Sequence, residues 1–244
     1  MKKLITLFLI ILLVLPTYLA IGQGQNIVVF RGNGSSNTNV CPIPGGYNHH
    51  YYLNAISQAT LGAAGITGQC LISRLAFELH SVNSSSATKT MKIYLKEVTP
   101  ASFTVNSNLS NLISGATVVF DNTINIPGGT TGWYDFVFPT PFPYSGTGDL
   151  LLFVEGFSSS SSSSDFVHCL YDGIGANTNF FTRTLDGGAL NLNNTLTNLA
   201  GTIPNRTNTF RFHTRLTVIY SNELAIKPVT HQTENSIDLN ASFF

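Results

Sequence analysis

Four acidic residues lie in the strand-rich middle of the sequence, at Asp121, Asp135, Asp149 and Glu155. Placed across neighbouring strands, two of them could form the carboxylate pair that a glycosidase requires. Single carboxylates usually lie on solvated faces or in turns, and these positions suit that role as well. The sequence contains neither G-x-S-x-G nor H-E-x-x-H, which are motifs of serine hydrolases and zinc peptidases. We therefore expect a protein that is not an enzyme and has no catalytic residues.

Histidines and acidic loops are the candidates for binding a metal ion. His49 and His50 are adjacent, and adjacent residues on a strand point to opposite faces, so both cannot readily bind one ion. The other candidate histidines are isolated from one another: His80, His168 and His213. Calcium would use oxygen ligands in loops such as Asp172–Asn179 or Asp121–Asn125, but no EF-hand spacing occurs. We expect no metal ligands and no cofactor, with Ca²⁺ as the one ion that such loops could accept.

Aromatic residues could instead bind a carbohydrate, because rings stack on the apolar faces of sugars while side-chain amides and carboxylates bond their hydroxyl groups. Trp133 is the first candidate, followed by Tyr47, Tyr51 and Tyr52. The alternative for Trp133 is a position between strands or under the proline-rich segment Pro139–Pro143, since large aromatic residues are mostly buried. The burial of Trp133 therefore decides between a binding face and a packed core.

The sequence has three cysteines, Cys41, Cys70 and Cys169. An exported chain favours disulfides, and an odd number leaves one thiol over or pairs it between chains. We expect a bond between Cys41 and Cys70, because both lie in the N-terminal part beside glycine-rich segments. Cys169 lies in an alternating segment and would then behave as a small buried hydrophobic residue.

The segment 132–157 is the element that positions these residues. Within it, Tyr134, Phe136 and Phe138 alternate with Trp133, Asp135 and Val137, a pattern that is typical of a half-buried strand. We expect the three prolines Pro139, Pro141 and Pro143 to end the pairing of this strand. The turn-forming residues Ser145–Gly148 and a second, buried strand over Leu150–Val154 follow.

Alternation predicts further strands along the chain. In 71–80, the residues expected on the buried face are Leu71, Ser73, Leu75, Phe77 and Leu79. The strand Thr90–Val98 is expected to pair with it as a long hairpin, and Thr209–Tyr220 to close the fold. With 8–12 residues between strands and no long helix, the sequence predicts an all-β protein, an antiparallel jelly-roll-like β-sandwich of about 8–10 strands.

The N-terminus has the features of a Sec-type signal peptide over residues 1–22. Met1–Lys3 is basic, Leu4–Leu19 is almost continuously apolar, and Ala20-Ile21-Gly22 suits cleavage. We expect a β-sandwich domain over residues 23–220, a linker or tail over 221–244, and no transmembrane span after cleavage. Without Lys2 and Lys3, 10 basic residues remain against 12 acidic ones, a net charge of −2 with histidine neutral. No basic patch is present, so nucleic acid is not an expected partner.

The order of four segments resembles a known family. The segments are LISRLAFELH, TMKIYLKEVTPASF, GWYDFVFPTPFPYSGTGDLLLFVEGF and TFRFHTRLTVIY. This order is similar to the jelly-roll-like β-sandwich domain of secreted Bacteroidetes proteins, and the resemblance covers about residues 26–220. Such domains often occur with fibronectin-type or Ig-like modules and a secretion-sorting domain. No such module precedes Phe244, so we expect a short secreted form or a truncated reading frame.

The resemblance implies adhesion or carbohydrate binding and provides no catalytic residues. We therefore expect a non-catalytic module that is secreted or held at the cell surface, with a glycan or a cell-surface protein as partner. A ligand-free structural domain of the cell envelope is the alternative. A hydrolase acting on glycans is a third, and it would require two carboxylates facing each other in one cleft.

Overall fold

The structure is a computed structural model, and it describes residues 25–30, 36–38, 41–83, 88–99, 113–159, 165–173, 180–185 and 210–220. All of them belong to one compact unit, Gln23–Ser221. The signal peptide expected over residues 1–22, the tail expected over 221–244 and most of the loop Asp172–Asn179 lie outside the described residues. Among the residues that are described, no helix is long and apolar enough to cross a membrane.

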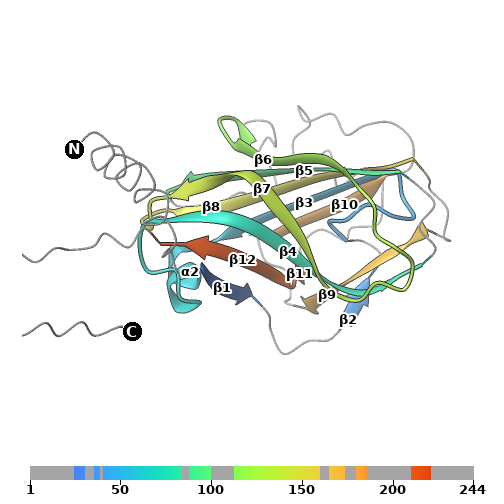
Figure 1. The fold of residues 1–244 in the computed structure, drawn as a ribbon, viewed down its shortest axis with the longest axis horizontal. Coiled ribbons are helices and arrows are strands. Elements are labelled where there is room, and N and C mark those ends of the chain that lie inside the picture. The colour runs from blue at the N-terminus through green and yellow to red at the C-terminus, as the bar shows by residue number, and fades with distance from the viewer. Residues whose placement is uncertain are drawn as a thin grey trace, which may run out of the picture. The chain divides into compact units, whose positions relative to one another are not determined.

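Two antiparallel sheets form the fold (Figure 1). The seven-stranded sheet contains β1 (Gln25–Phe30), β2 (Ser36–Thr38), β4 (Cys70–Val82), β7 (Gly132–Tyr144), β9 (Val167–Gly173), β11 (Phe210–Phe212) and β12 (Thr214–Ile219). The five-stranded sheet contains β3 (His49–Ile56), β5 (Lys89–Val98), β6 (Thr117–Ile124), β8 (Asp149–Ser158) and β10 (Phe180–Leu185). A short helix, α2 (Gln58–Ala63), follows β3, and the side chain of Ser57 caps its first turn by accepting the N–H of Thr60.

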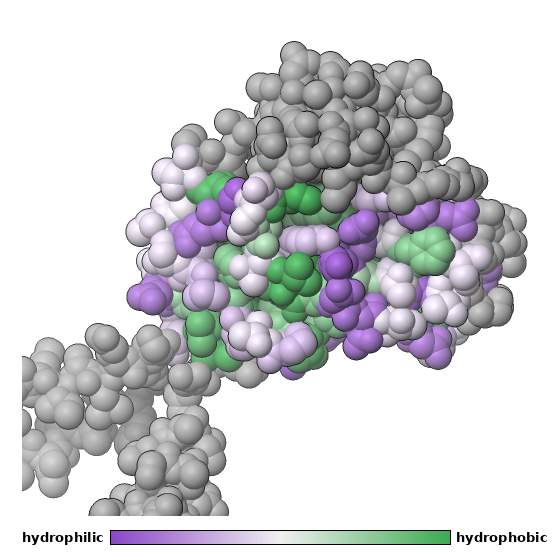
Figure 2. Space-filling view, turned by 90° about the horizontal axis from the view of Figure 1, so that it is seen from above, coloured by the Kyte–Doolittle hydropathy of each residue, from purple (hydrophilic) through white to green (hydrophobic). Residues whose placement is uncertain are grey.

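The hydrophobic core lies between the two sheets. Each sheet contributes alternate residues to it, such as Leu75 and Phe136 from the seven-stranded sheet and Ile93 and Leu152 from the five-stranded sheet. The prediction of an antiparallel β-sandwich is therefore confirmed, although the described residues form twelve strands. On the face of the molecule seen in Figure 2, hydrophobic residues lie in small groups with hydrophilic ones between them.

Strand β7 runs through the proline-rich segment, so the prediction that the prolines end its pairing is wrong. Phe142 pairs with Ile72 and Val137 pairs with Arg74, so Ser73 alone faces the four residues Phe138–Pro141. Pro139 and Pro141 lie in this wide bulge, where the ladder requires no N–H group from them. The bulge thus accommodates the prolines while pairing continues on both sides of it.

The same bulge reverses which residues of β4 face the core. Ile72 is fully buried, whereas Leu71 is exposed. The predicted buried face, Leu71 and Ser73 together with Leu75, Phe77 and Leu79, is therefore wrong for its first two members. An irregularity at Ser73 shifts the alternation by one residue, and a one-residue shift moves a side chain to the other face.

Strands β4 and β5 do not form the predicted hairpin. Strand β5 pairs with β6 and β8 in the five-stranded sheet, and β4 pairs with β12, β7 and β9 in the other sheet. The alternation in both strands is real, but it fits two strands that face each other across a core as well as two that pair side by side.

A disulfide joins Cys41 to Cys169, with 5.5 Å between their Cα atoms, and Cys70 is a buried free thiol. The predicted bond between Cys41 and Cys70 is therefore wrong, as is the unbonded state expected for Cys169. Cys169 lies opposite Leu79 near the end of β4, whereas Cys70 begins that strand. Nine residues of extended strand separate the two positions by roughly 30 Å, so Cys41 cannot reach both. Burial raises the pKa of the Cys70 thiol to about 11.

Candidate functional site

Strand alternation places a set of polar side chains on the side of the seven-stranded sheet that faces away from the core. Leu75 and Phe77 of β4 and Phe136 of β7 pack in the core, so their neighbours Ala76, Glu78 and Asp135 lie on the opposite face. The registers of β4 with β7 and with β12 align these residues in rows across the three strands. One row contains Trp133, Glu78 and His213, and the next contains Asp135, Ala76 and Arg215.

The first group on this face is the arginine–tryptophan cluster, which consists of Arg74, Trp133, Asp135 and Arg215. Nη2 of Arg215 donates to both carboxylate oxygens of Asp135, at 2.9 and 2.8 Å. The guanidinium carbon of Arg215 lies 5.0 Å from the centroid of the Trp133 ring, within the range of a cation–π interaction. Nη1 of Arg74 lies 4.0 Å from Asp135 Oδ2. Ala76 lies between Arg215 and Asp135 in the register, and its small side chain lets the guanidinium reach across β4.

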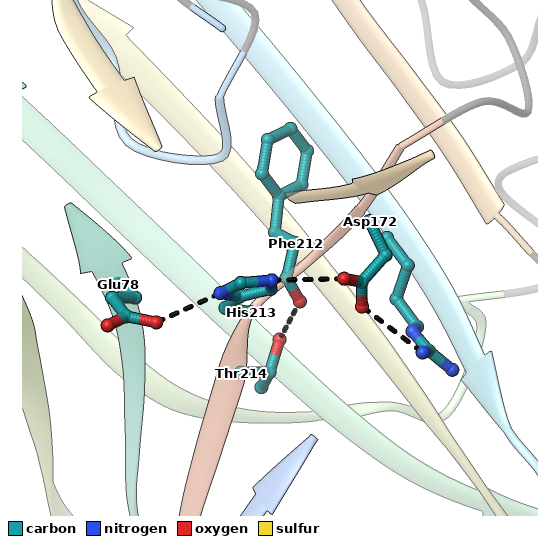
Figure 3. A network of polar contacts seen from close by, with 6 residues as sticks. Glu78, Asp172, Phe212, His213 and Thr214 are labelled. Carbon is teal, nitrogen blue, oxygen red and sulfur yellow. Dashed lines mark hydrogen bonds and ion pairs between the residues drawn. The ribbon is translucent and has the colours of Figure 1, made fainter. Parts of the chain in front are cut away.

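The second group is the histidine network, which consists of Glu78, Asp172, Arg211 and His213. Figure 3 shows the His213 ring between the carboxylates of Glu78 and Asp172. His213 Nδ1 lies 2.9 Å from Glu78 Oε2, and its Nε2 lies 3.1 Å from Asp172 Oδ1. Arg211 Nη2 donates to the other oxygen of Asp172 at 3.2 Å. His213, Glu78 and Asp172 are all buried, so the network joins β4, β9 and β11 through charged groups that are shielded from water.

The backbone of His213 explains why its ring lies between two strands. Strand β11 pairs with β9, and β12 pairs with β4, so the chain changes partner at His213. The His213 N–H donates to the carbonyl of Leu170 on β9, at 3.1 Å, and its carbonyl accepts the N–H of Glu78 on β4, at 3.3 Å. The imidazole is thereby fixed between β4 and β9, with one carboxylate on each side.

The two contacts of the His213 ring restrict where protons can be. A carboxylate only accepts hydrogen bonds, and a neutral imidazole donates through one nitrogen only. Both contacts are hydrogen bonds if the ring carries two protons, or if one of the two carboxyl groups is protonated.

The contacts of the histidine network are with one another. In the part of the chain that the structure describes, no three His, Cys, Asp or Glu side chains are placed to hold a metal ion. The His213 ring lies between Glu78 and Asp172 and keeps their carboxylates apart (Figure 3).

The structure separates the aromatic residues that the sequence indicated as ligand-binding. Trp133 is partly exposed on the outer face of the seven-stranded sheet. Tyr47 is also partly exposed, but it precedes β3 of the other sheet, where its ring lies near His50 and Phe166 at 5.9 and 6.1 Å between centroids. The two rings therefore belong to different surfaces, and Trp133 alone lies beside a charged cluster.

Tyr51 and Tyr52 are buried, so the prediction that they belong to an exposed binding surface is wrong. Tyr52 is 0% exposed and packs in the core, with ring centroids 6.0 Å from Phe77 and 5.2 Å from Phe212. Tyr51 is 1% exposed and stacks with His49 and Phe153 on the outer side of the five-stranded sheet. Neither ring presents a face to solvent, because β3 is buried on both of its sides.

Sequence reasoning missed most of the polar residues on the outer face, although one strand carries a signal for them. Arg211, His213 and Arg215 are spaced by two residues in TFRFHTRLTVIY, and this spacing places their side chains on one side of an extended chain. Three basic or titratable residues on one side of a strand predict a charged face. Their partners Glu78, Asp135 and Asp172 are distant in sequence and follow only from the register.

A second polar group is buried in the core, at the end of the five-stranded sheet where β3 and β5 begin. His50 Nδ1 lies 2.7 Å from the carbonyl oxygen of Cys41, and Nε2 accepts the N–H of Gly45 at 3.2 Å. Burial, together with nearby Lys89, lowers the pKa of His50 to about 4. Lys89 is itself fully buried, its Nζ has no hydrogen-bond partner among the described residues, and burial lowers its pKa while Asp165 opposes that shift.

Comparison with known proteins gives structural similarity only. No family model matches the sequence, and no curated protein matches it. One similar solved structure contains the cysteine protease and lectin-like domains of Cwp84, a surface-layer-associated protein of Clostridium difficile, with 13% identity over 71% of this chain and a TM-score of 0.37. Another is the structure of the infectious bursal disease virus Gx strain, with 10% identity over 82% of this chain and a TM-score of 0.25. This chain spans 33% and 37% of the lengths of those two chains.

Proposed function

We propose that the protein is a non-catalytic module, secreted or held at the cell surface, that binds carbohydrate through the arginine–tryptophan cluster. The observation that carries this proposal is the partly exposed ring of Trp133, which lies beside Arg215 and Asp135 on an outward-facing sheet surface. An aromatic ring with charged hydrogen-bonding groups beside it offers both contacts that a sugar requires, one for its apolar face and one for its hydroxyl groups.

The environment of Trp133 suits binding better than core packing. Its neighbours along β7 on the same face are Asp135 and the exposed Val137. The cation–π contact and the bond to Asp135 hold Arg215 in place, so the polar groups beside the ring are positioned before a ligand arrives. Such pre-organisation lowers the entropy cost of binding.

The carboxylates considered from the sequence support a non-catalytic role, because each has a partner of its own. Asp135 bonds Arg215, and Asp121 pairs with Lys92 at 3.1 Å. Asp149 accepts the backbone N–H of Gln58 at 2.7 Å, and Glu155 accepts the hydroxyl of Tyr94 at 3.3 Å. The disulfide between Cys41 and Cys169 supports an extracellular location, because disulfides persist in oxidising compartments.

A glycan array probed with the wild-type protein and the W133A variant tests the proposal. We expect W133A to lose binding to the glycans that the wild-type protein retains. The matched control is F157A, which removes an exposed aromatic ring from β8 of the other sheet and should bind as the wild type does. Equal binding by all three proteins would place any site elsewhere. A blank array, together with no partner in a cell-surface pull-down, would favour a ligand-free structural domain of the cell envelope.

A further inference from the structure

The arginine–tryptophan cluster carries an excess of positive charge. Arg74 and Arg215 lie on either side of one carboxylate, that of Asp135, so the three side chains together carry one positive charge. Glu78, in the next row, is engaged in the histidine network by His213. The face beside Trp133 therefore carries two guanidinium groups, Arg74 and Arg215, and the carboxylate of Asp135 neutralises one of them.

Both arginines retain N–H donors that make no hydrogen bond with the described residues. Among those residues, only Nη2 of Arg215 makes hydrogen bonds, both to Asp135; its Nε makes none, but that atom is buried and is not open to a ligand. Among the described residues, the polar contact of the Arg74 guanidinium is the 4.0 Å ion pair with Asp135, which is longer than a hydrogen bond, and its side chain is 39% exposed. A guanidinium has five N–H donors in a planar fork that matches a carboxylate.

Exposed apolar side chains lie on the same face as these donors. The register places Ile27, Thr217, Arg74 and Val137 in one row across β1, β12, β4 and β7. Ile27 and Val137 are exposed to 64% and 55%. Together with Trp133, these side chains give the face apolar surface as well as guanidinium groups.

From these contacts we propose that the ligand class is an acidic polysaccharide built of uronic-acid units. The carboxylate of one unit binds Arg74 and Arg215, and the apolar face of a sugar ring lies against Trp133. This inference rests on the proposed carbohydrate-binding function and adds to it the charge of the sugar.

The test compares two polymers that differ only in whether the carboxyl group is charged. Titration calorimetry measures binding of the intact protein to polygalacturonate and to its fully methyl-esterified form, with dextran and dextran sulfate as further probes. We expect polygalacturonate to bind at least tenfold more tightly than the methyl ester, because the ester removes a charge-assisted hydrogen bond.

Two variants, each of which lacks one positive charge, test whether the acidic polymer binds at the arginine–tryptophan cluster. R74Q should weaken binding to polygalacturonate about tenfold. K92Q removes one positive charge at a similarly exposed position, 37% of its side chain, on the other sheet, and should leave binding unchanged.

Each contrary result has one meaning. Equal affinity for the free acid and the methyl ester, or binding of dextran alone, would overturn the acidic ligand class and leave carbohydrate binding in place. Equal losses in R74Q and K92Q, or equal binding of dextran sulfate, would show general attraction to anions and overturn the inference. No binding to any of the four polymers, together with a blank glycan array, would remove the proposed function as well.

Discussion

Mild acid should destabilise this fold through His50. The neutral ring satisfies both of its contacts, since Nδ1–H donates to Cys41 and Nε2 accepts from Gly45. Burial, helped by Lys89, lowers the pKa of His50 from 6.5 to about 4 in the folded protein. The unfolded chain therefore binds a proton at a higher pH than the folded protein does.

The sign and size of the effect follow from this difference. His50 contributes its full stabilisation above pH 6.5, loses it as the pH falls from 6.5 to 4, and loses no more below that. Since each unit of pKa difference corresponds to about 1.4 kcal/mol, the free energy of unfolding should fall by roughly 3 kcal/mol across this window.

Urea unfolding of the wild-type protein and H50Q, measured between pH 4 and pH 7, isolates this contribution. The amide of glutamine does not titrate, so H50Q should show a shallower dependence on pH, whatever its stability at pH 7. Burial also lowers the pKa of His168, but His168 and the carboxylates are present in both proteins, so the difference between the two curves excludes them. Parallel curves would refute the reasoning, because His50 would then not titrate with unfolding.

Three further tests of the structure use urea unfolding. Removing the disulfide in C41A/C169A should lower the free energy of unfolding by about 5 kcal/mol, because the bond closes a loop of 128 residues. C70A, at the buried free thiol, should lower it by about 1 kcal/mol. Similar losses in the two variants would mean that the bond does not form. H213A removes the imidazole that contacts two buried carboxylates and should lower the free energy of unfolding by about 3–5 kcal/mol. A loss under about 1 kcal/mol would contradict a stabilising role for this buried network. K89M replaces a buried amine, which has no hydrogen-bond partner among the described residues, with an apolar side chain of similar size and should stabilise the protein by about 1 kcal/mol. A loss of stability would show that the attraction between Lys89 and Asp165 outweighs the cost of burying the amine.

The strands could be predicted from the sequence because alternation is a local property. Phe136 and Phe138 alternate with Asp135 and Val137, and the structure buries the first pair while Val137 is exposed. Register and sheet membership are not local. The bulge opposite Ser73 comes from how β7 and β4 pair, and the same alternation in β5 fits either sheet.

The candidate site was predictable only in part, for the same reason. Trp133 could be identified because it is opposite an apolar strand face, and its position away from the core follows from alternation. Its partner Arg215 lies 82 positions further along the chain, and only the pairing of β4 with both β7 and β12 brings the two together. The cysteine prediction failed similarly, since closeness in sequence placed Cys41 with Cys70 and the length of β4 separates them.

The pairing of β1 with β12 determines how the domain would respond to tension. Gln25 lies opposite Ile219, so a force applied at the two ends of the described chain pulls one pair of strands apart from a shared end. Hydrogen bonds loaded in this way break one after another rather than together. The bond between Cys41 and Cys169 then limits the extension, because the 128 residues between them cannot lengthen. This withholds about 460 Å of extended chain, at about 3.6 Å per residue, so the domain would yield early but lengthen only through the residues outside the disulfide loop.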